Sequence, residues 1–161
     1  MTDELGEPGT PWVTGALVVR RLIEENRLAQ VVPDLELAAR QLRHAHQSLD
    51  AAREQAERFP MPAFTSVYDA SRLALAALLE HQGLRARADG SHLTVEETVT
   101  AQIGPALGRK FRALRLLRHS TEYPSPGDTD ITVDDVREAL QLTETLLPAV
   151  ERLMTQMGVF R

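Results

Sequence analysis

The sequence predicts an all-α protein, an antiparallel four-helix bundle with one extra N-terminal helix. Aromatic residues make up only 4% of the 161 residues, and alanine and leucine dominate, which favours packed helices over sheet. Apolar residues recur three and four positions apart over long segments, as in helices buried along one face. Proline and glycine separate these segments at positions typical of helix ends.

The first part of the chain is expected to lie outside the bundle. Residues 1–12 are rich in glycine and proline and are predicted to be a disordered leader. This segment carries acids and no basic region, so it does not resemble a signal peptide. Residues 13–32 are predicted to be a helical extension, with its helix over Val13–Leu28. The bundle then occupies residues 33–158.

The first two bundle helices are indicated by their caps and apolar positions. Asp34 can cap a helix that continues to about Phe59, where Pro60 is expected to end it. Its apolar stripe comprises Leu35, Ala38, Leu42, Ala45, Leu49 and Ala52. The next helix, Ser66–Gln82, is apolar on nearly all sides, which predicts that it is buried. Gly83 is its expected left-handed stop.

A polar loop is predicted over Leu84–Leu93. Thr94 and Glu97 then match the capping-box pattern, which predicts a helix start. That helix is expected to continue until Gly104–Pro105 interrupts it.

Two more helices complete the predicted bundle. One begins near Ala106 and ends before Pro124. The last begins at Thr132 and Asp135 and contains Pro148, which is expected to bend it.

Composition limits the function. The absence of cysteine excludes disulfides, zinc–thiolate sites and cysteine nucleophiles. No apolar run is long enough to predict a transmembrane helix, and we expect a cytoplasmic protein without a metal or cofactor. The net charge of −5 means that any nucleic-acid contact must use a local basic patch.

Such a patch is present between Arg109 and Arg118. Five basic residues fall within ten positions, with no acid until Glu122. Arg118 occupies a position where the apolar period calls for a hydrophobic residue, so it is expected to face the bundle and to need a partner. Asp69, Glu122 and a bound phosphate are the three candidate partners.

A polar stripe adjoins this position on the same helix. It comprises Arg112, Arg115, His119 and Tyr123. By spacing alone these residues could equally form a solvated face near a helix C-terminus, where cations are favoured.

The segment Arg118–Pro124, following Arg112 and Arg115, resembles the signature of the HEPN family. That signature is an arginine, a polar residue and, a few positions later, a histidine. The resemblance extends to three other segments. These are Tyr68–Arg72, Gly90–His92 and Val133–Val136, and the similarity as a whole covers about Pro33 to Met157.

The HEPN resemblance implies RNA binding and, in many members, metal-independent RNA cleavage by a homodimer. It implies that Arg118 contacts the phosphate, with Arg112 and Arg115 beside it, and that His119 orients the site. Tyr123 stands where the family has its catalytic histidine, and a phenol is a poor base at neutral pH.

The resemblance also implies supporting residues and partners. The supporting residues are Tyr68, Asp69, Arg72 and His92. The implied partners are RNA, a second copy of the chain, and a nucleotidyltransferase or an antitoxin.

Three hypotheses about function follow. The first is a HEPN protein that binds RNA or another phosphate-bearing ligand with weak catalysis or none. The second is a metal-independent endoribonuclease of toxin or stress-response type that uses His119 or Tyr123. The third is a non-enzymatic helical bundle that binds a protein and pairs Arg118 internally.

Overall fold

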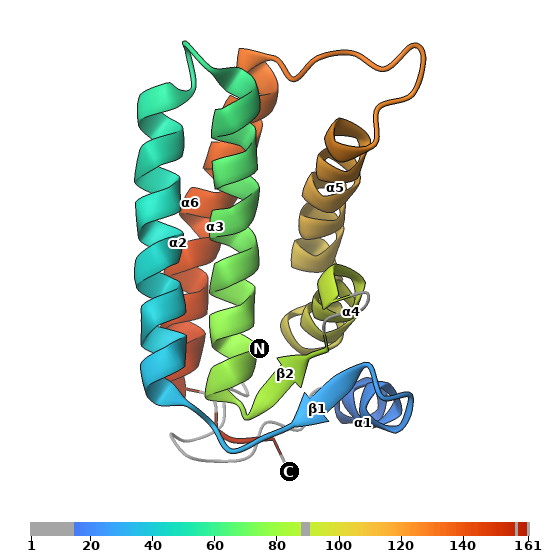
Figure 1. Ribbon diagram of the computed structural model, residues 1–161. Coiled ribbons are helices and arrows are strands. Elements are labelled where there is room, and N and C mark those ends of the chain that lie inside the picture. The colour runs from blue at the N-terminus through green and yellow to red at the C-terminus, as the bar shows by residue number, and fades with distance from the viewer. Residues whose placement is uncertain (1–14, 88–90, 157, 161) are drawn as a thin grey trace.

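The structure, a computed structural model, describes residues 15–87, 91–156 and 158–160, and this part of the chain is mostly helical (Figure 1). The predicted leader, Val13, Gly90 and Met157 lie outside it. The elements in order are α1 (Ala16–Glu24), β1 (Leu28–Gln30), α2 (Leu35–Gln55), α3 (Pro60–His81), β2 (Leu84–Ala86), α4 (Ser91–Ile103), α5 (Pro105–Glu122) and α6 (Val133–Gln156).

Helices α2, α3 and α6 run side by side, and α4 and α5 follow one another along the other flank of α3 (Figure 1). Helix α3 is therefore central, which agrees with its nearly all-round apolar sequence. Its hydroxyl Ser71 Oγ lies 2.8 Å from Thr143 Oγ1 of α6, so this buried polar pair is satisfied.

The hairpin of α2 and α3 differs from prediction at its turn. The predicted cap is confirmed, since Asp34 Oδ1 accepts a hydrogen bond from Leu37 N at 2.8 Å. Helix α2 ends at Gln55, before the predicted end near Phe59, and α3 begins at Pro60. Pro60 thus starts a helix, because proline at the first helical position loses no hydrogen bond and has the required φ.

The segment predicted as a polar loop contains strand β2. It pairs antiparallel with β1, with Leu28 opposite Ala86. The helix predicted over Val13–Leu28 accordingly ends at Glu24, and Asn26 follows in a left-handed conformation with φ 60°. Both strands are short, so their pairing was set by tertiary contacts that no sequence pattern revealed.

The predicted start of α4 at Thr94 is wrong. The helix already begins at Ser91, and Thr94 is fully buried within it. Glu97 does not cap the helix, because its carboxylate lies 2.9 Å from Arg27 Nη1. The capping-box pattern therefore arose from residues that serve packing and an ion pair.

The joint between α4 and α5 is close and depends on glycine. Gly104 has a φ of 115°, and Pro105 begins α5, as the sequence predicted for this break. At Gly108, a Cβ atom would lie 1.9 Å from Thr100 Oγ1. The two helices can approach this closely only because Gly108 has no side chain.

We expect Gly108→Ala to lower the free energy of unfolding by roughly 1 to 3 kcal/mol, because the added methyl forces α4 and α5 apart. Urea denaturation would measure this. Ala113→Gly on the exposed side of α5 is the control and should cost no more than about 1 kcal/mol, from helix propensity alone. An unchanged midpoint for Gly108→Ala would contradict the close approach.

Helix α6 begins as predicted. Thr132 Oγ1 accepts from Asp135 N at 3.2 Å, and Asp135 Oδ2 accepts from Thr132 N at 2.8 Å. Pro148 lies inside this helix, and beyond its end Phe160 is buried and donates its N–H to Gln82 O at 2.9 Å.

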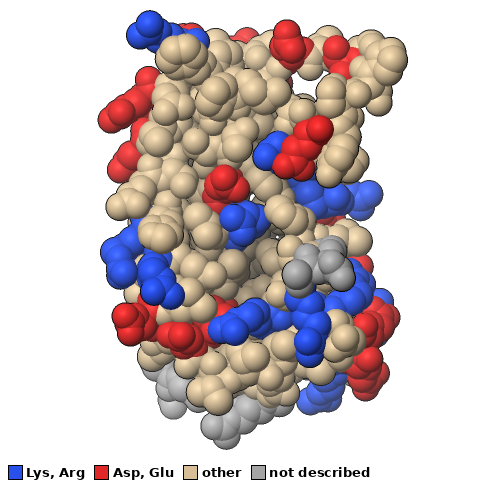
Figure 2. All heavy atoms as spheres, in the orientation of Figure 1, with Lys and Arg blue, Asp and Glu red and all other residues tan. Residues whose placement is uncertain are grey.

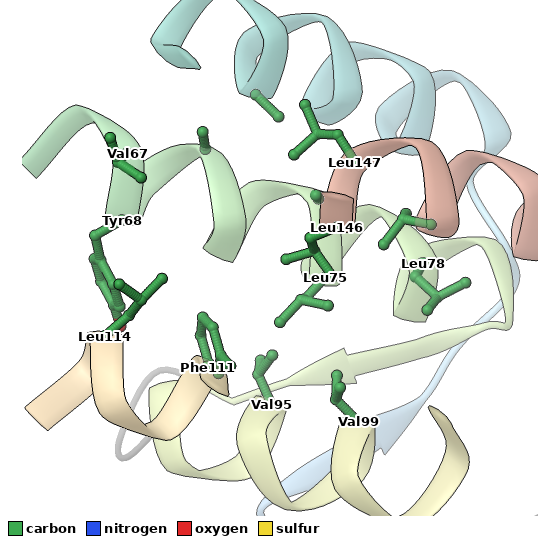
Figure 3. Packing of buried hydrophobic residues seen from close by; sticks show 14 of the residues in the cluster. Val67, Tyr68, Leu75, Leu78, Val95, Val99, Phe111, Leu114, Leu146 and Leu147 are labelled. Atoms are coloured by element: carbon green, nitrogen blue, oxygen red, sulfur yellow. The ribbon is translucent and has the colours of Figure 1, made fainter. Parts of the chain in front are cut away.

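The hydrophobic core joins the two flanks of α3. Phe111 and Leu114 of α5 point toward Tyr68, and Val95 of α4 lies beside Phe111, with Val99 farther along α4 (Figure 3). This contact holds α5 on α3. In the part of the chain that the structure describes, no helix has the length and apolarity needed to cross a membrane.

Candidate functional site

A cavity of about 380 Å³ opens between α3, α4 and α5. Over this region the surface is hollowed, and basic and acidic side chains stand next to one another (Figure 2). The residues that line it are Tyr68, Asp69, Arg72, His92, Arg115, Arg118, His119 and Glu122. Seven of these eight were site residues predicted from the sequence, and they come from three different helices.

Arg118 lines this cavity with 22% of its side chain exposed. Its Nη2 lies 2.7 Å from Glu122 Oε1, one helical turn further along α5, and its Nη1 donates to Thr121 Oγ1 at 3.4 Å. Of the three candidate partners, the structure therefore shows Glu122. Because Glu122 is half exposed, this pair remains open to solvent and to exchange.

Arg115 has a deeper partner that the sequence did not reveal. Its Nε donates to Glu96 Oε2 at 2.5 Å, and the Glu96 side chain is only 9% exposed. This pair joins α5 to α4 and holds the Arg115 guanidinium beside the cavity. One feature of the sequence could have indicated this role for Glu96: it is a charged residue next to Val95 and one turn before Val99, on the apolar part of α4.

Tyr68 and His92 form the apolar side of the cavity. The ring of Tyr68 is nearly parallel to those of His92 and Phe111, with centroids 5.6 Å and 6.0 Å away. Burial raises the pKa of Tyr68 to about 12, so its hydroxyl is protonated at neutral pH, and this hydroxyl is hydrogen-bonded to His92 Nδ1. Burial, and then the nearby charge of Arg72, lower the pKa of His92.

Asp69 and Arg72 extend this wall along α3. Their closest charged atoms, Asp69 Oδ1 and Arg72 Nε, are 3.6 Å apart, and both side chains are partly exposed. The pair is loose, so the Arg72 guanidinium has donors left for another acceptor.

Two predicted site residues lie elsewhere. Arg112 lines a separate groove between α1, α4 and α5, beside Glu96 and Glu97. Tyr123 is 68% exposed and packs against His119 with ring centroids 5.0 Å apart, but it does not line the cavity. Helix α5 continues to Glu122, so Arg118 and Tyr123 do not converge within one chain.

We expect His92 to make stability fall on acidification. Since its pKa is lower in the folded state than the ordinary value near 6.5, the unfolded chain takes up a proton first. The contribution is fully present above about pH 6.5 and is lost as the pH falls through the folded pKa. Urea denaturation of the wild type and His92→Gln between about pH 5 and pH 8 would measure it.

In that experiment the wild type should lose more stability than His92→Gln as the pH falls. Taking the difference removes every pH effect that the two proteins share. Parallel pH profiles for the two proteins would contradict the shift.

The cavity thus presents three guanidinium groups, two carboxylates and two imidazoles to a ligand. Guanidinium donors suit the oxygens of phosphate, and the neutral His92 and Tyr68 offer hydrogen bonds without added charge. Among the residues that the structure describes, no group of three His, Cys, Asp or Glu side chains could hold a metal ion. No family model, curated protein or solved structure matches this chain.

Proposed function

We propose that this chain is a HEPN-like protein that binds RNA, or another phosphate-bearing ligand, in the cavity between α3, α4 and α5. The observation that carries the proposal is that Arg72, Arg115 and Arg118 line this one cavity from two helices. Arginines that meet from separate elements can surround a phosphate, whereas a basic face on one helix can only touch it.

The internal ion pairs of these arginines are compatible with ligand binding. Exposed pairs such as Arg118–Glu122 contribute only about 0 to 1 kcal/mol, so a phosphate can displace the acid at little cost. The Arg72–Asp69 pair is longer still. Arg115 differs, because its pair with Glu96 is largely buried and is expected to stay intact while the remaining guanidinium N–H groups bind the ligand.

The arrangement of the helices supports a further proposal, that the fold is the four-helix bundle of the HEPN family. The HEPN bundle would consist of α2, α3, α6 and the flank made by α4 and α5, with α1 added outside. Helix α3 contacts α2, α4, α5 and α6. We include a homodimer in the proposal, since the family resemblance implies one.

The same cavity favours binding over cleavage. Tyr123, in the position of the catalytic histidine, does not line it, and the Tyr68 hydroxyl remains protonated at neutral pH. A general base must reach the proton that it removes, and the lining groups that could act so, the imidazoles of His92 and His119 and the carboxylates of Asp69 and Glu122, do not include the residue in the motif position of the catalytic histidine. We therefore expect weak cleavage or none, and the toxin-like endoribonuclease is the weaker alternative.

Binding of a labelled single-stranded RNA of mixed sequence at low salt would test the proposal. We expect Arg118→Ala and Arg72→Ala to weaken binding about tenfold each, since each removes a phosphate contact. Arg112→Ala is the matched control, because it removes the same charge from α5 outside the cavity. It should change binding much less.

Three outcomes would decide between the alternatives. Equal loss of binding in all three variants would mean that the basic run acts through charge alone, and no binding by the wild type would leave the protein-interaction hypothesis. Cleavage of the RNA in EDTA by the wild type, lost in Arg118→Ala, would instead establish the endoribonuclease.

A further inference from the structure

A groove of about 480 Å³ lies between α5 and α6, on the side of α5 that faces away from α4. It is larger than the arginine-lined cavity and shares no lining residue with it. Most of its surface comes from α5 and α6, with one residue from α3. The apolar residues that line it are Phe64, Ala113, Leu114, Leu117, Ala139 and Leu142.

The groove exists because α5 and α6 each pack on α3 and hardly contact one another. Helix α5 packs on α3 and α4, whereas α6 packs on α3 and α2. The two helices are antiparallel, since α5 ends and α6 begins at the same end of the molecule (Figure 1). The chain crosses between them there through residues 123–132, so the groove is open along its length.

The walls of the groove match the length and spacing of a helix. On α5 the lining residues fall between Lys110 and Leu117, and on α6 between Asp135 and Thr145, mostly three or four positions apart. At 1.5 Å per residue these spans are about 10 Å and about 15 Å, or two to three turns. Ala113 is exposed and Leu117 is partly exposed, so this apolar surface is open to a partner. Grooves of this kind bind amphipathic helices.

The two ends of the groove carry opposite charges. Lys110 lines the α5 wall far from the end of that helix, and Asp135 and Glu138 line the first turns of α6. Because α5 and α6 are antiparallel, these are opposite ends of the groove (Figure 1). Asp135 already caps α6, but neither Lys110 nor Glu138 forms an ion pair within the part of the chain that the structure describes. The macrodipoles of α5 and α6 oppose one another, so these side chains set the polarity of the groove.

We propose that an amphipathic helix of a partner protein binds in this groove, with its N-terminal end beside Glu138 and its C-terminal end beside Lys110. A helix carries partial positive charge at its N-terminus and partial negative charge at its C-terminus, so this orientation places each end beside the opposite charge. Apolar residues three and four apart on that helix would contact Ala113, Leu117 and Leu142. A base in its first turn and an acid in its last turn would complete the match.

The charges favour a helix over a lipid. A fatty acid could pair its carboxylate with Lys110, but its alkyl chain would then lie beside Asp135 and Glu138 and leave both acids unmatched. This inference is independent of the proposed phosphate site, because the two sites have no lining residue in common.

Selection from a library of helical peptides of about 14 residues, or four turns, would test the proposal. Leucines three and four apart form a fixed apolar face, and the residues of the first and last turns vary. We expect the peptides retained by the wild type to carry Lys or Arg in the first turn and Asp or Glu in the last. The intrinsic stability of a free helix favours the reverse distribution, so it cannot produce this result.

A groove variant locates the peptide. We expect Ala113→Trp, which fills the groove, to weaken binding of a selected peptide at least about tenfold in calorimetric titration. Ala106→Trp is the matched control, because Ala106 is exposed in the first turn of α5 and lies outside the groove. It should leave the affinity unchanged.

A charge exchange tests the orientation. The double variant Lys110→Glu with Glu138→Lys reverses the polarity of the groove at two exposed positions, so the fold should be retained. We expect it to bind the selected peptide about tenfold more weakly than the wild type does, and to prefer a peptide in which the terminal bases and acids are exchanged. Equal affinity of both peptides for both proteins would overturn the proposed helix orientation.

Other occupants of the groove give different results. If no selected peptide is sensitive to Ala113→Trp, the proposal is overturned. A fluorescent fatty acid that binds the wild type and not Ala113→Trp would then assign the groove to a lipid, and self-association lost in Ala113→Trp would assign it to a second copy of the chain. Absence of RNA binding would overturn the proposed function and leave the peptide result standing.

Discussion

Replacing Arg115 by alanine is expected to lower the free energy of unfolding by about 3 kcal/mol or more, because it leaves the Glu96 carboxylate buried without its cation. Glu96 is nearly enclosed, and Arg115 Nε lies 2.5 Å from it. Breaking a buried pair costs far more than removing a surface charge, since the remaining ion cannot be solvated. Urea denaturation with circular dichroism would measure the change.

A double variant separates this mechanism from simple loss of packing. Arg115→Met with Glu96→Leu should recover most of the stability, because no charge is left buried. Arg112→Ala, one turn earlier on α5 and exposed, should change stability by no more than about 0.5 kcal/mol. If Arg115→Ala proves as mild as Arg112→Ala, the Glu96 pair does not hold α5 to α4.

Replacing Phe111 by alanine is expected to lower the free energy of unfolding by about 3 to 5 kcal/mol, the range for a large buried aromatic. Phe111 is 1% exposed and lies between α3 and α4, stacked on Tyr68 with ring centroids 6.0 Å apart (Figure 3). The change would remove the main apolar contact of α5 with both helices. It should also free the Tyr68 ring, and with it the hydrogen bond to His92.

The loss at Phe111 should therefore appear in the site as well as in stability. With the protein still folded at low temperature, we expect Phe111→Ala to weaken RNA binding, since α5 carries Arg115 and Arg118. Leu116→Ala is the control, because Leu116 is 49% exposed on the same helix and should change stability by no more than about 0.5 kcal/mol. Similar denaturation midpoints for the two variants would show that Phe111 does not anchor α5.

The helices that the sequence predicted best are those with strong local signals. Asp34 at the start of α2, Gly83 after α3, Gly104–Pro105 between α4 and α5, and Thr132 with Asp135 at α6 all act as predicted. Each signal depends only on neighbouring backbone atoms or on the φ of one residue. Such signals mark a helix end through local hydrogen bonds or backbone conformation, so they do not depend on the tertiary structure.

The predictions that were wrong concern patterns whose meaning depends on distant residues. Thr94 and Glu97 match a capping box, yet burial of Thr94 and the Arg27 ion pair decide their conformation. The strands β1 and β2 are too short to show the two-residue alternation of a strand in their sequence. They form because the fold brings the two segments together, where their backbones hydrogen-bond. Propensity is weak evidence when packing can override it.

The sequence predicted most of the residues that line the candidate site, but it did not predict which acid pairs with each arginine. Periodicity alone placed Arg118 toward the bundle, and the resemblance implied Tyr68, Asp69, Arg72 and His92, which share a cavity with it. Two site residues implied by the resemblance, Arg112 and Tyr123, lie outside that cavity. For Tyr123 the reason is that α5 stays helical to Glu122, which turns Tyr123 away from Arg118.

By itself the sequence determined a mostly helical chain, its strongest helix ends and an arginine placed among apolar positions. The tertiary structure alone decided which acid meets each arginine, that Glu96 anchors Arg115, and that a groove opens between α5 and α6. The physical reason is that helix periodicity is local, with side chains a turn apart sharing one face. Ion pairs and cavities instead join residues far apart in sequence, and they exist only once α3, α4 and α5 have packed.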